Sequence, residues 1–114
     1  MLIVDDQPPF RSVARTLVTM LPGYEVVGEA ESGEDAVAQA ATTHPGVVLM
    51  DINLPGINGF QATRQITDAD PNVKVLLLST YGSDDLPDDI EACGAVGYLH
   101  KEDLAPGALR AMLD

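Results

Sequence analysis

Four short apolar runs of this sequence each end in polar side chains that phosphoryl transfer and metal binding can use. In chain order these side chains are Asp5 and Asp6, Asp51, Ser79 and Thr80, and Lys101. Polar groups at the carboxyl ends of neighbouring parallel strands meet at one edge of an open sheet. The pattern therefore predicts a crevice that collects carboxylates, hydroxyls and an ammonium, which together suit a divalent cation and a phosphoryl group.

The adjacent pair Asp5-Asp6 is a candidate cation site, with a turn or a helix cap as the alternative. Adjacent side chains of a regular strand point to opposite faces, but both can address one crevice where the strand ends. Two carboxylates about 4 Å apart repel by roughly 4 kcal/mol at an effective dielectric of about 20. A cluster that includes Asp51 therefore requires a cation or a retained proton. Oxygen donors without His or Cys favour a hard ion such as Mg²⁺.

Asp51 is the candidate nucleophile, because a carboxylate at the end of a buried strand can attack phosphorus and form an aspartyl phosphate. A simple cap of the strand end is the alternative. Pro55, Gly56 and Gly59 shape the following loop, where glycine permits a close backbone approach and a carbonyl ligand.

The hydroxyls of Ser79 and Thr80 can donate to a phosphoryl oxygen, and Lys101 supplies a mobile charge that can reach Asp51 or the phosphoryl group. Each of these residues alone indicates little, because hydroxyls are common at strand ends and most lysines are solvated. Their placement at the ends of successive strands is what makes the combination informative.

The elements that must position these groups alternate between strand and helix, which indicates an α/β fold with a parallel sheet covered on both faces. Strands are expected at about 2–5 and 24–30, and as three further runs that end at Asp51, Ser79 and about Leu99. The runs 47–50 and 75–78 are continuously apolar, as in strands buried on both sides.

Five helices are expected to connect these strands and to follow the last one. The first starts at Pro8-Pro9, where Pro8 biases Gln7 toward an extended conformation, and stops at Pro22-Gly23. Its inward positions at helical spacing are Val13, Leu17, and Met20 or Leu21. The remaining helices are expected from about Ser32 (burying Ala36, Val37, Ala40 and Ala41), from about Asn58, from Asp84 or Asp85 through Pro87 to Cys93-Gly94, and over 103–113.

The composition fits one domain with an aliphatic core. The chain has 114 residues, of which 46% are hydrophobic and only 4% aromatic, with no Trp. No apolar run approaches the roughly 20 residues that a membrane span needs, and no signal peptide is expected before the aspartates. The single cysteine, Cys93, cannot form an internal disulfide and is expected to be buried, which fits a cytoplasmic location.

The formal net charge of −12 argues against direct nucleic-acid binding and against an anionic membrane as a partner. Partners should be cationic, metal-bound or apolar where they touch the chain. Glu31, Glu34 and Asp35 are interpreted as solvated surface. His44 is expected to lie exposed in a loop, and His100 lacks a neighbouring nitrogen or sulfur ligand for a metal role.

Taken together, the segments LIVDDQ (2–7), VVLMDINLPGINGF (47–60), VLLLST (75–80) and GAVGYLHK (94–101) resemble the receiver domain of bacterial two-component response regulators. The stretches VVGEAESGEDAV (26–37), LLLSTY (76–81) and GYLHKED (97–103) are most similar to the subgroup with a LuxR/NarL-type helix-turn-helix. The resemblance implies a flavodoxin-like (βα)5 three-layer sandwich with a parallel sheet in the order 2-1-3-4-5. It also implies that residues 1–114 form one receiver domain whose output domain is absent from this chain.

The resemblance assigns a role to each matching residue. Asp51 would accept a phosphoryl group from a sensor histidine kinase or a small acyl phosphate. Asp6 would bind Mg²⁺ directly, Asp5 mainly through water, and Asn53 through its backbone carbonyl.

In the same resemblance, Ser79, with Thr80 beside it, and Lys101 would contact the phosphoryl group, and Tyr98 would move inward with Ser79. The domain would then be a switch rather than an enzyme, and it could form a homodimer on phosphorylation. Pro8-Pro9 and Pro87 depart from the usual family pattern near the starts of two helices.

Three other functions are compatible with parts of this pattern. Phosphatases of the haloacid dehalogenase type also use an aspartate nucleophile with Mg²⁺, but they carry a second acid where this chain has Asn53. A receiver-like docking module that is never phosphorylated would not need the complete set of site residues. A nucleotide- or flavin-binding domain would be repelled by Asp5-Asp6 in its first loop.

Overall fold

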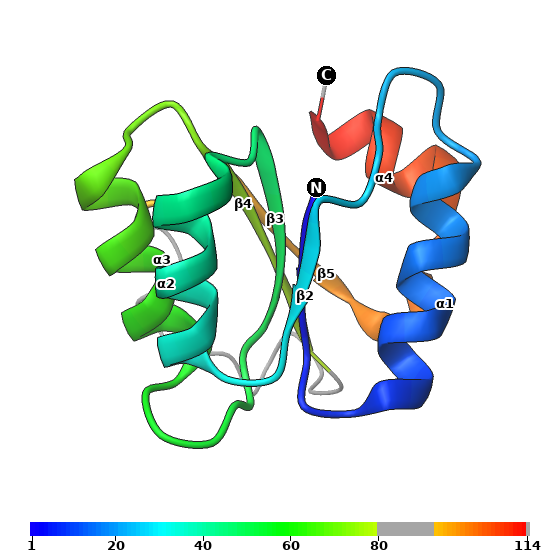
Figure 1. Ribbon diagram of the computed structural model, residues 1–114. Helices are drawn as coiled ribbons and strands as arrows, with labels where there is room; N and C mark the ends of the chain where they lie inside the picture. Colours follow the sequence, from blue (N-terminus) through cyan, green and yellow to red (C-terminus); the bar gives the residue numbers. More distant parts are fainter. Residues whose placement is uncertain (80–92, 114) are drawn as a thin grey trace.

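The apolar runs of the sequence pair into a single parallel sheet in the computed structural model, which describes residues 1–79 and 93–113 (Figure 1). The strands are β1 (Leu2–Val4), β2 (Gly28–Ala30), β3 (Val47–Asp51), β4 (Lys74–Ser79) and β5 (Gly97–His100). Their order is β2-β1-β3-β4-β5, which confirms the predicted order. The chain therefore adds β2 on one side of β1 and β3 to β5 on the other, and α/β folds bind their ligands at the point between β1 and β3 where the strand order reverses.

Helices cover both faces of the sheet and make it the middle layer of three (Figure 1). Helices α2 (Gly33–Thr43) and α3 (Gly59–Ala69) lie on one face, and α1 (Pro8–Thr19) and α4 (Pro106–Leu113) lie on the other. A 3₁₀ turn, η2 (Lys101–Asp103), follows β5. The helix expected around Pro87 lies outside the described residues. Within the described residues, no helix has the length and apolar character to cross a bilayer.

Two apolar clusters, one on each face of the sheet, explain why apolar and polar residues do not alternate along the central strands. Val48, Met50 and Leu77 pack toward α2 and α3, whereas Leu49 and Leu76 pack toward α1 and α4. Successive side chains of a strand point to opposite faces, so a sheet covered on both sides needs apolar residues at every position. The buried stretches 47–50 and 75–78 confirm that prediction.

The helix starts follow from local sequence. Gln7 is extended and Pro8 opens α1, as predicted from the effect of proline on the preceding residue. The Ser32 side chain accepts a hydrogen bond from the Asp35 amide at the start of α2, and Asn58 and Gln61 form a capping box at the start of α3.

The predicted inward positions of α1 were right for Leu17 and for Leu21 as the alternative, but wrong for Val13. Val13 is 54% exposed and Met20 is also exposed, whereas Ala14 and Val18 are buried and Leu17 is partly buried. Leu21, the alternative to Met20, is buried just after the helix. The sequence is compatible with two rotations of α1, one that buries Val13 and one that buries Ala14. Packing against the sheet selects the rotation that buries the smaller Ala14.

Three smaller expectations also need correction. β2 covers only 28–30 instead of 24–30, because its partner β1 pairs through Leu2–Val4 alone. The expected helix 103–113 is divided into η2 and α4, since Pro106 disfavours a helical conformation at the residue before it. In α2, Ala36 and Ala40 are buried and Val37 is partly buried as expected, but Ala41 is exposed, in a groove that α2 forms with α3.

Candidate functional site

The strand ends bring the three predicted aspartates together. Asp5 follows β1 and Asp51 ends β3, and these two strands are neighbours with Val4 beside Met50. Asp5, Asp6 and Asp51 each offer a carboxylate oxygen, and these oxygens all lie within 4.8 Å of one another. Asp5 is fully buried and Asp51 is 4% exposed, whereas Asp6 is exposed. The cluster therefore has a buried floor and one open side.

Lys101, the first residue of η2 directly after β5, joins the cluster and is more firmly held than the sequence suggested. Its Nζ lies 2.6 Å from Asp5 Oδ2 and 3.6 Å from Asp51 Oδ2. The same ammonium sits 4.3 Å from the centre of the Phe10 ring, within range of a cation–π contact. Two carboxylates and an aromatic ring thus surround this nearly buried group, and its predicted reach to Asp51 is present.

Burial and neighbouring charge together disfavour ionisation of Asp51. Burial is the largest cause that, together with the neighbouring Asp5 and Asp6 carboxylates, raises the pKa of Asp51 from its ordinary value of 3.8 to about 6. Lys101 and the Asn53 amide, which donates to Asp51 Oδ1 at 3.3 Å, act in the opposite direction. The raised pKa shows that Lys101 does not fully neutralise the cluster, so a further cation would be favourable here.

The donor set fits a hard divalent cation. It consists of carboxylate oxygens on three side chains with an open side toward Asp6, and among residues 1–79 and 93–113 no sulfur or imidazole ligand joins them. Mg²⁺ binds through one or two carboxylates and keeps several waters, which such an open cluster allows. Asn53, predicted to contribute its carbonyl, lies exposed two residues beyond Asp51 and close enough for its amide to reach that carboxylate.

The loop after Asp51 depends on glycine, as the sequence suggested. Gly56 adopts a positive φ of 74°, which is costly for other residues. A Cβ placed on Gly59 would lie 2.4 Å from the Asp51 carbonyl oxygen. Gly59 therefore lets the start of α3 approach the end of β3 closely.

Of the remaining predicted residues, Ser79 and Tyr98 are described by the structure and Thr80 is not. Ser79 is fully buried at the end of β4, next to Leu78, whose carbonyl accepts from the Ile52 amide at 3.0 Å. Tyr98 is partly buried on β5 and packs against the cluster that includes Leu77. Thr80 lies outside the described residues. These positions put Ser79 at the same edge as Asp51, with Tyr98 one strand further along the sheet.

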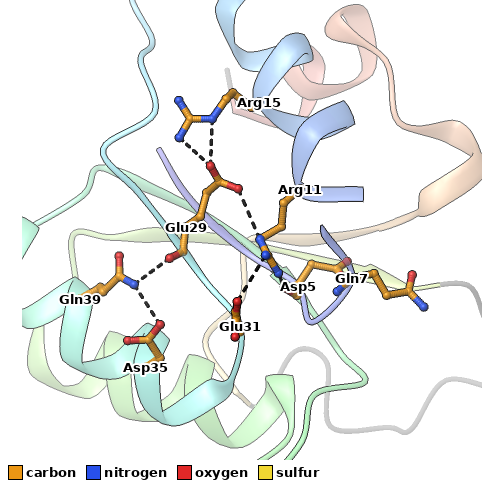
Figure 2. Close-up of polar contacts among 8 residues, drawn as sticks. All are labelled: Asp5, Gln7, Arg11, Arg15, Glu29, Glu31, Asp35 and Gln39. Carbon is orange, nitrogen blue, oxygen red and sulfur yellow. Dashed lines mark hydrogen bonds and ion pairs between the residues drawn. The ribbon is translucent and has the colours of Figure 1, made fainter. Parts of the chain in front are cut away.

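Two residues near the site carried no clear signal in the sequence. Arg11 Nη1 donates to the Asp5 carbonyl oxygen at 2.7 Å, and Figure 2 shows this arginine beside the carboxylates of Glu29 in β2 and of Glu31 just after it. Glu34, interpreted as solvated surface, is exposed, but its Oε1 accepts from the Ile57 amide at 2.6 Å in the loop after Asp51. Contacts between residues that lie 6 and 23 positions apart depend on the fold and are not visible in spacing alone.

Three other expectations concern residues outside the cluster. Cys93 is buried, as predicted. His44 is exposed as predicted, and it ends α2 in a left-handed conformation with φ of 48°. His100 Nδ1 accepts from the Glu102 amide at 3.2 Å and caps the 3₁₀ turn.

The fold and the acidic cluster define a doubly wound α/β domain with an oxygen-rich site at the carboxyl edge of its sheet. A family model described as the response regulator receiver domain matches residues 1–114. The chain belongs to the response regulator receiver domain family, whose members act in two-component signalling.

Curated relatives agree with this family and include regulators of transcription. The transcriptional regulatory protein DegU of Brevibacillus brevis is 40% identical over 111 residues, covering 97% of this chain and 47% of that protein. Response regulator UvrY of Escherichia coli (strain K12) is 42% identical over 100 residues, covering 88% of this chain and 46% of that protein. The chain thus spans about half the length of these relatives.

Solved structures confirm the fold. A LuxR-family two-component response regulator from Aurantimonas sp. SI85-9A1 has a TM-score of 0.86 and 34% identity, covering 96% of this chain and 78% of that one. The signal receiver domain of the response regulator NarL from Mycobacterium tuberculosis has a TM-score of 0.89 and 28% identity, covering 99% of this chain and 91% of that one. The resemblance to the LuxR/NarL-type subgroup is confirmed.

Proposed function

We propose that this domain is a phosphorylation-driven switch in which Asp51 accepts a phosphoryl group in a Mg²⁺-dependent reaction. The observation that carries the proposal is the meeting of three carboxylates within 4.8 Å, with the Lys101 ammonium against Asp5 and Asp51. A sensor histidine kinase is the proposed phosphoryl donor. The proposal treats residues 1–114 as one receiver domain, and includes a cytoplasmic location, which the single cysteine fits.

The chemical step is a phosphoryl transfer to a carboxylate. An Asp51 carboxylate oxygen attacks phosphorus and forms an O–P bond, while the N–P bond of the phosphohistidine breaks and its electron pair returns to the imidazole nitrogen. The attacking carboxylate has to be ionised, and a pKa of about 6 leaves Asp51 mostly ionised at pH 7. Acetyl phosphate would serve in the same way, with acetate as the leaving group.

Each residue of the site has a role in this proposal. The carboxylates of Asp5, Asp6 and Asp51, together with the Asn53 carbonyl, would hold Mg²⁺. When bound, Mg²⁺ would neutralise negative charge on the carboxylates and on the phosphoryl oxygens.

Lys101 and Ser79 would respond to the new group. Lys101, which already contacts the Asp5 and Asp51 carboxylates, would gain the phosphoryl group as a further anionic partner, and the Ser79 hydroxyl would donate to a phosphoryl oxygen. A phosphoryl group that interacts differently with two arrangements of β4 and β5 shifts their equilibrium, and Tyr98 would report the shift outward.

The proposed output is control of transcription through a helix-turn-helix domain outside this chain. Its support is the length of the curated relatives, of which DegU is named a transcriptional regulator and is covered to only 47%. In this proposal the acidic receiver itself contacts neither nucleic acid nor membrane, is not an enzyme with turnover, and can form a homodimer when phosphorylated. A phosphatase of the haloacid dehalogenase type is disfavoured, because Asn53 cannot supply that class's second acid.

The test is covalent modification of the purified chain. Incubation with acetyl phosphate and Mg²⁺ should add the mass of one phosphoryl group, and beryllofluoride with Mg²⁺ should shift the amide resonances of β4 and β5. Asp51→Asn should abolish both effects, while Asp68→Asn, at an exposed position on α3, should retain them. An unphosphorylated docking module would show neither the mass gain nor the shifts in the wild type.

A further inference from the structure

Arg11 is a nearly buried cation that contacts the backbone of the acidic strand end. Its side chain is 12% exposed, and its Nη1 donates to the Asp5 carbonyl oxygen at 2.7 Å. The same guanidinium reaches two carboxylates of the edge-strand region, with Nε 3.4 Å from Glu29 Oε1 and Nη2 3.5 Å from Glu31 Oε1 (Figure 2). One planar group thus bridges the end of β1 and the β2 segment.

We propose that Arg11 is a positioning residue for the cation site, which orients the peptide between Asp5 and Asp6 so that both carboxylates face Asp51. This inference rests on the proposed Mg²⁺-dependent function. Arg11 itself would touch neither the cation nor the phosphoryl group in this role.

The geometry of the peptide explains why one hydrogen bond can matter here. The Asp5 carbonyl and the Asp6 amide and Cα share one plane, so the direction of that carbonyl determines where the Asp6 side chain begins. The Asp5 amide donates to the Ala30 carbonyl at 3.0 Å, and Asp5 Oδ1 accepts from the Gln7 amide at 2.8 Å. Arg11 contacts the remaining backbone group of Asp5, its carbonyl oxygen. In our proposal this contact sets the direction in which the exposed Asp6 side chain leaves the backbone.

The surrounding network explains why the guanidinium holds one orientation. Arg15, one turn along α1, donates to Glu29 Oε2 through Nε at 2.9 Å and Nη2 at 2.6 Å, which leaves Glu29 Oε1 toward Arg11. Gln39 of α2 donates to the Glu29 carbonyl at 2.8 Å (Figure 2). Helices from both faces therefore hold Glu29, since Arg15 of α1 binds its carboxylate and Gln39 of α2 binds its backbone carbonyl. Lysine could not reproduce this bridge, since an ammonium lacks the planar fork of arginine.

Arg15 offers a matched control for the experiment. Arg11→Met and Arg15→Met each remove one cation from the same network, but only Arg11 donates to the Asp5 carbonyl. In Arg15→Met the Arg11 guanidinium keeps its contacts with that carbonyl and with Glu31, so the proposed positioning should persist. Removal of a nearby positive charge should by itself leave the Mg²⁺ affinity unchanged or slightly higher. Mg²⁺ binding to the whole chain is measured by isothermal titration calorimetry, alongside chemical denaturation.

We expect Arg11→Met to weaken Mg²⁺ binding about tenfold, as for other residues that orient metal ligands, and Arg15→Met to bind at least as tightly as the wild type. Acetyl phosphate labelling of Arg11→Met should recover when the Mg²⁺ concentration is raised by the same factor. A merely structural role would lower the free energy of unfolding without this rescue. If Arg11→Met does not fold, Arg11→Gln and Arg15→Gln replace the pair with the same expected ranking.

Two contrary results have different meanings. Equal Mg²⁺ affinity in the Arg11 and Arg15 variants, with the wild type binding Mg²⁺, would overturn the positioning role and leave the proposed function intact. Absence of Mg²⁺ binding by the wild type would overturn the proposed function, and the role of Arg11 would fall with it.

Discussion

At the scale of single residues, the ionised form of Asp51 is electrostatically unfavourable in the folded protein. This carboxyl group is buried beside Asp5, and its pKa of about 6 records that the folded protein disfavours its charge. Lys101 offsets part of the cost from 3.6 Å, but its shorter contact of 2.6 Å goes to Asp5. An ammonium and a cluster of three carboxylates thus lie together in one site, and this favours a charged ligand.

The first prediction concerns the pH dependence of stability without divalent ions. The folded-state pKa of Asp51 is raised from 3.8 to about 6, so its stabilising effect is complete below about pH 4 and is lost as the pH rises through about 6. A shift of this size corresponds to at most about 3 kcal/mol. Asp51→Asn should therefore raise the free energy of unfolding at pH 7 by up to about 3 kcal/mol and remove this decline.

Chemical denaturation in the presence of a chelator, at several values between pH 4 and pH 8, measures the effect. Asp68→Asn removes an exposed carboxylate on α3 and should change the free energy of unfolding by less than about 0.5 kcal/mol. Parallel pH profiles for Asp51→Asn and the wild type would contradict the electrostatic account of Asp51.

At the scale of elements, the start of α2 supports the loop between β3 and α3. Glu34 accepts from the Ile57 amide at 2.6 Å, and its carboxylate lies so close that a Cβ on Gly56 would meet it at 2.5 Å. Gly33 approaches Ile57 in the same region, where a Cβ would lie 2.8 Å from the Ile57 carbonyl oxygen. The loop that carries Asn53 is therefore held by a helix that contributes no residue to the acidic cluster.

The second prediction follows from this contact. Glu34→Ala removes the acceptor of the Ile57 amide and should cost about 1 kcal/mol of unfolding free energy, with faster hydrogen exchange at that amide. Glu34→Gln keeps an oxygen acceptor of nearly the same size and should retain most of the protection. Equal exchange rates at Ile57 in the two variants would show that the contact does not hold the loop.

At the scale of the whole molecule, the net charge of −12 opposes compaction, and part of it is concentrated in the buried carboxylates of the site. A ligand that binds the folded state but not the unfolded state stabilises the fold by mass action. A bound Mg²⁺ would therefore act on global stability as well as on chemistry. Screening by monovalent salt reaches exposed charges well but buried ones poorly.

The third prediction separates stabilisation by specific Mg²⁺ binding from stabilisation by general ionic screening. Mg²⁺ at about 100 times its dissociation constant should raise the free energy of unfolding by about 2.7 kcal/mol, which corresponds to roughly 10 °C in Tm for a domain of this size. NaCl at the same ionic strength should produce a much smaller shift. Differential scanning calorimetry on the wild type measures both, and equal shifts from the two salts would argue against specific binding at the cluster.

The sequence by itself determined the kind of fold and most of the site. Continuous apolar runs and the helix stop and start signals are local features, and they located the five strands that the structure contains. The aspartates were identifiable because each directly follows such a run, and parallel strands place such ends at one edge. Family resemblance supplied the strand order and the roles of Ser79 and Tyr98, which no local pattern encodes.

Only the tertiary structure decided which side chains orient these groups. Arg11 and Phe10 lie on α1, and their contacts with the Asp5 carbonyl and the Lys101 ammonium exist because that helix packs beside the ends of β1 and β5. The register of α1, with Ala14 buried and Val13 exposed, has the same origin. An amphipathic pattern leaves the rotation of a helix uncertain by a residue, and the rotation is settled by packing against residues distant in the chain.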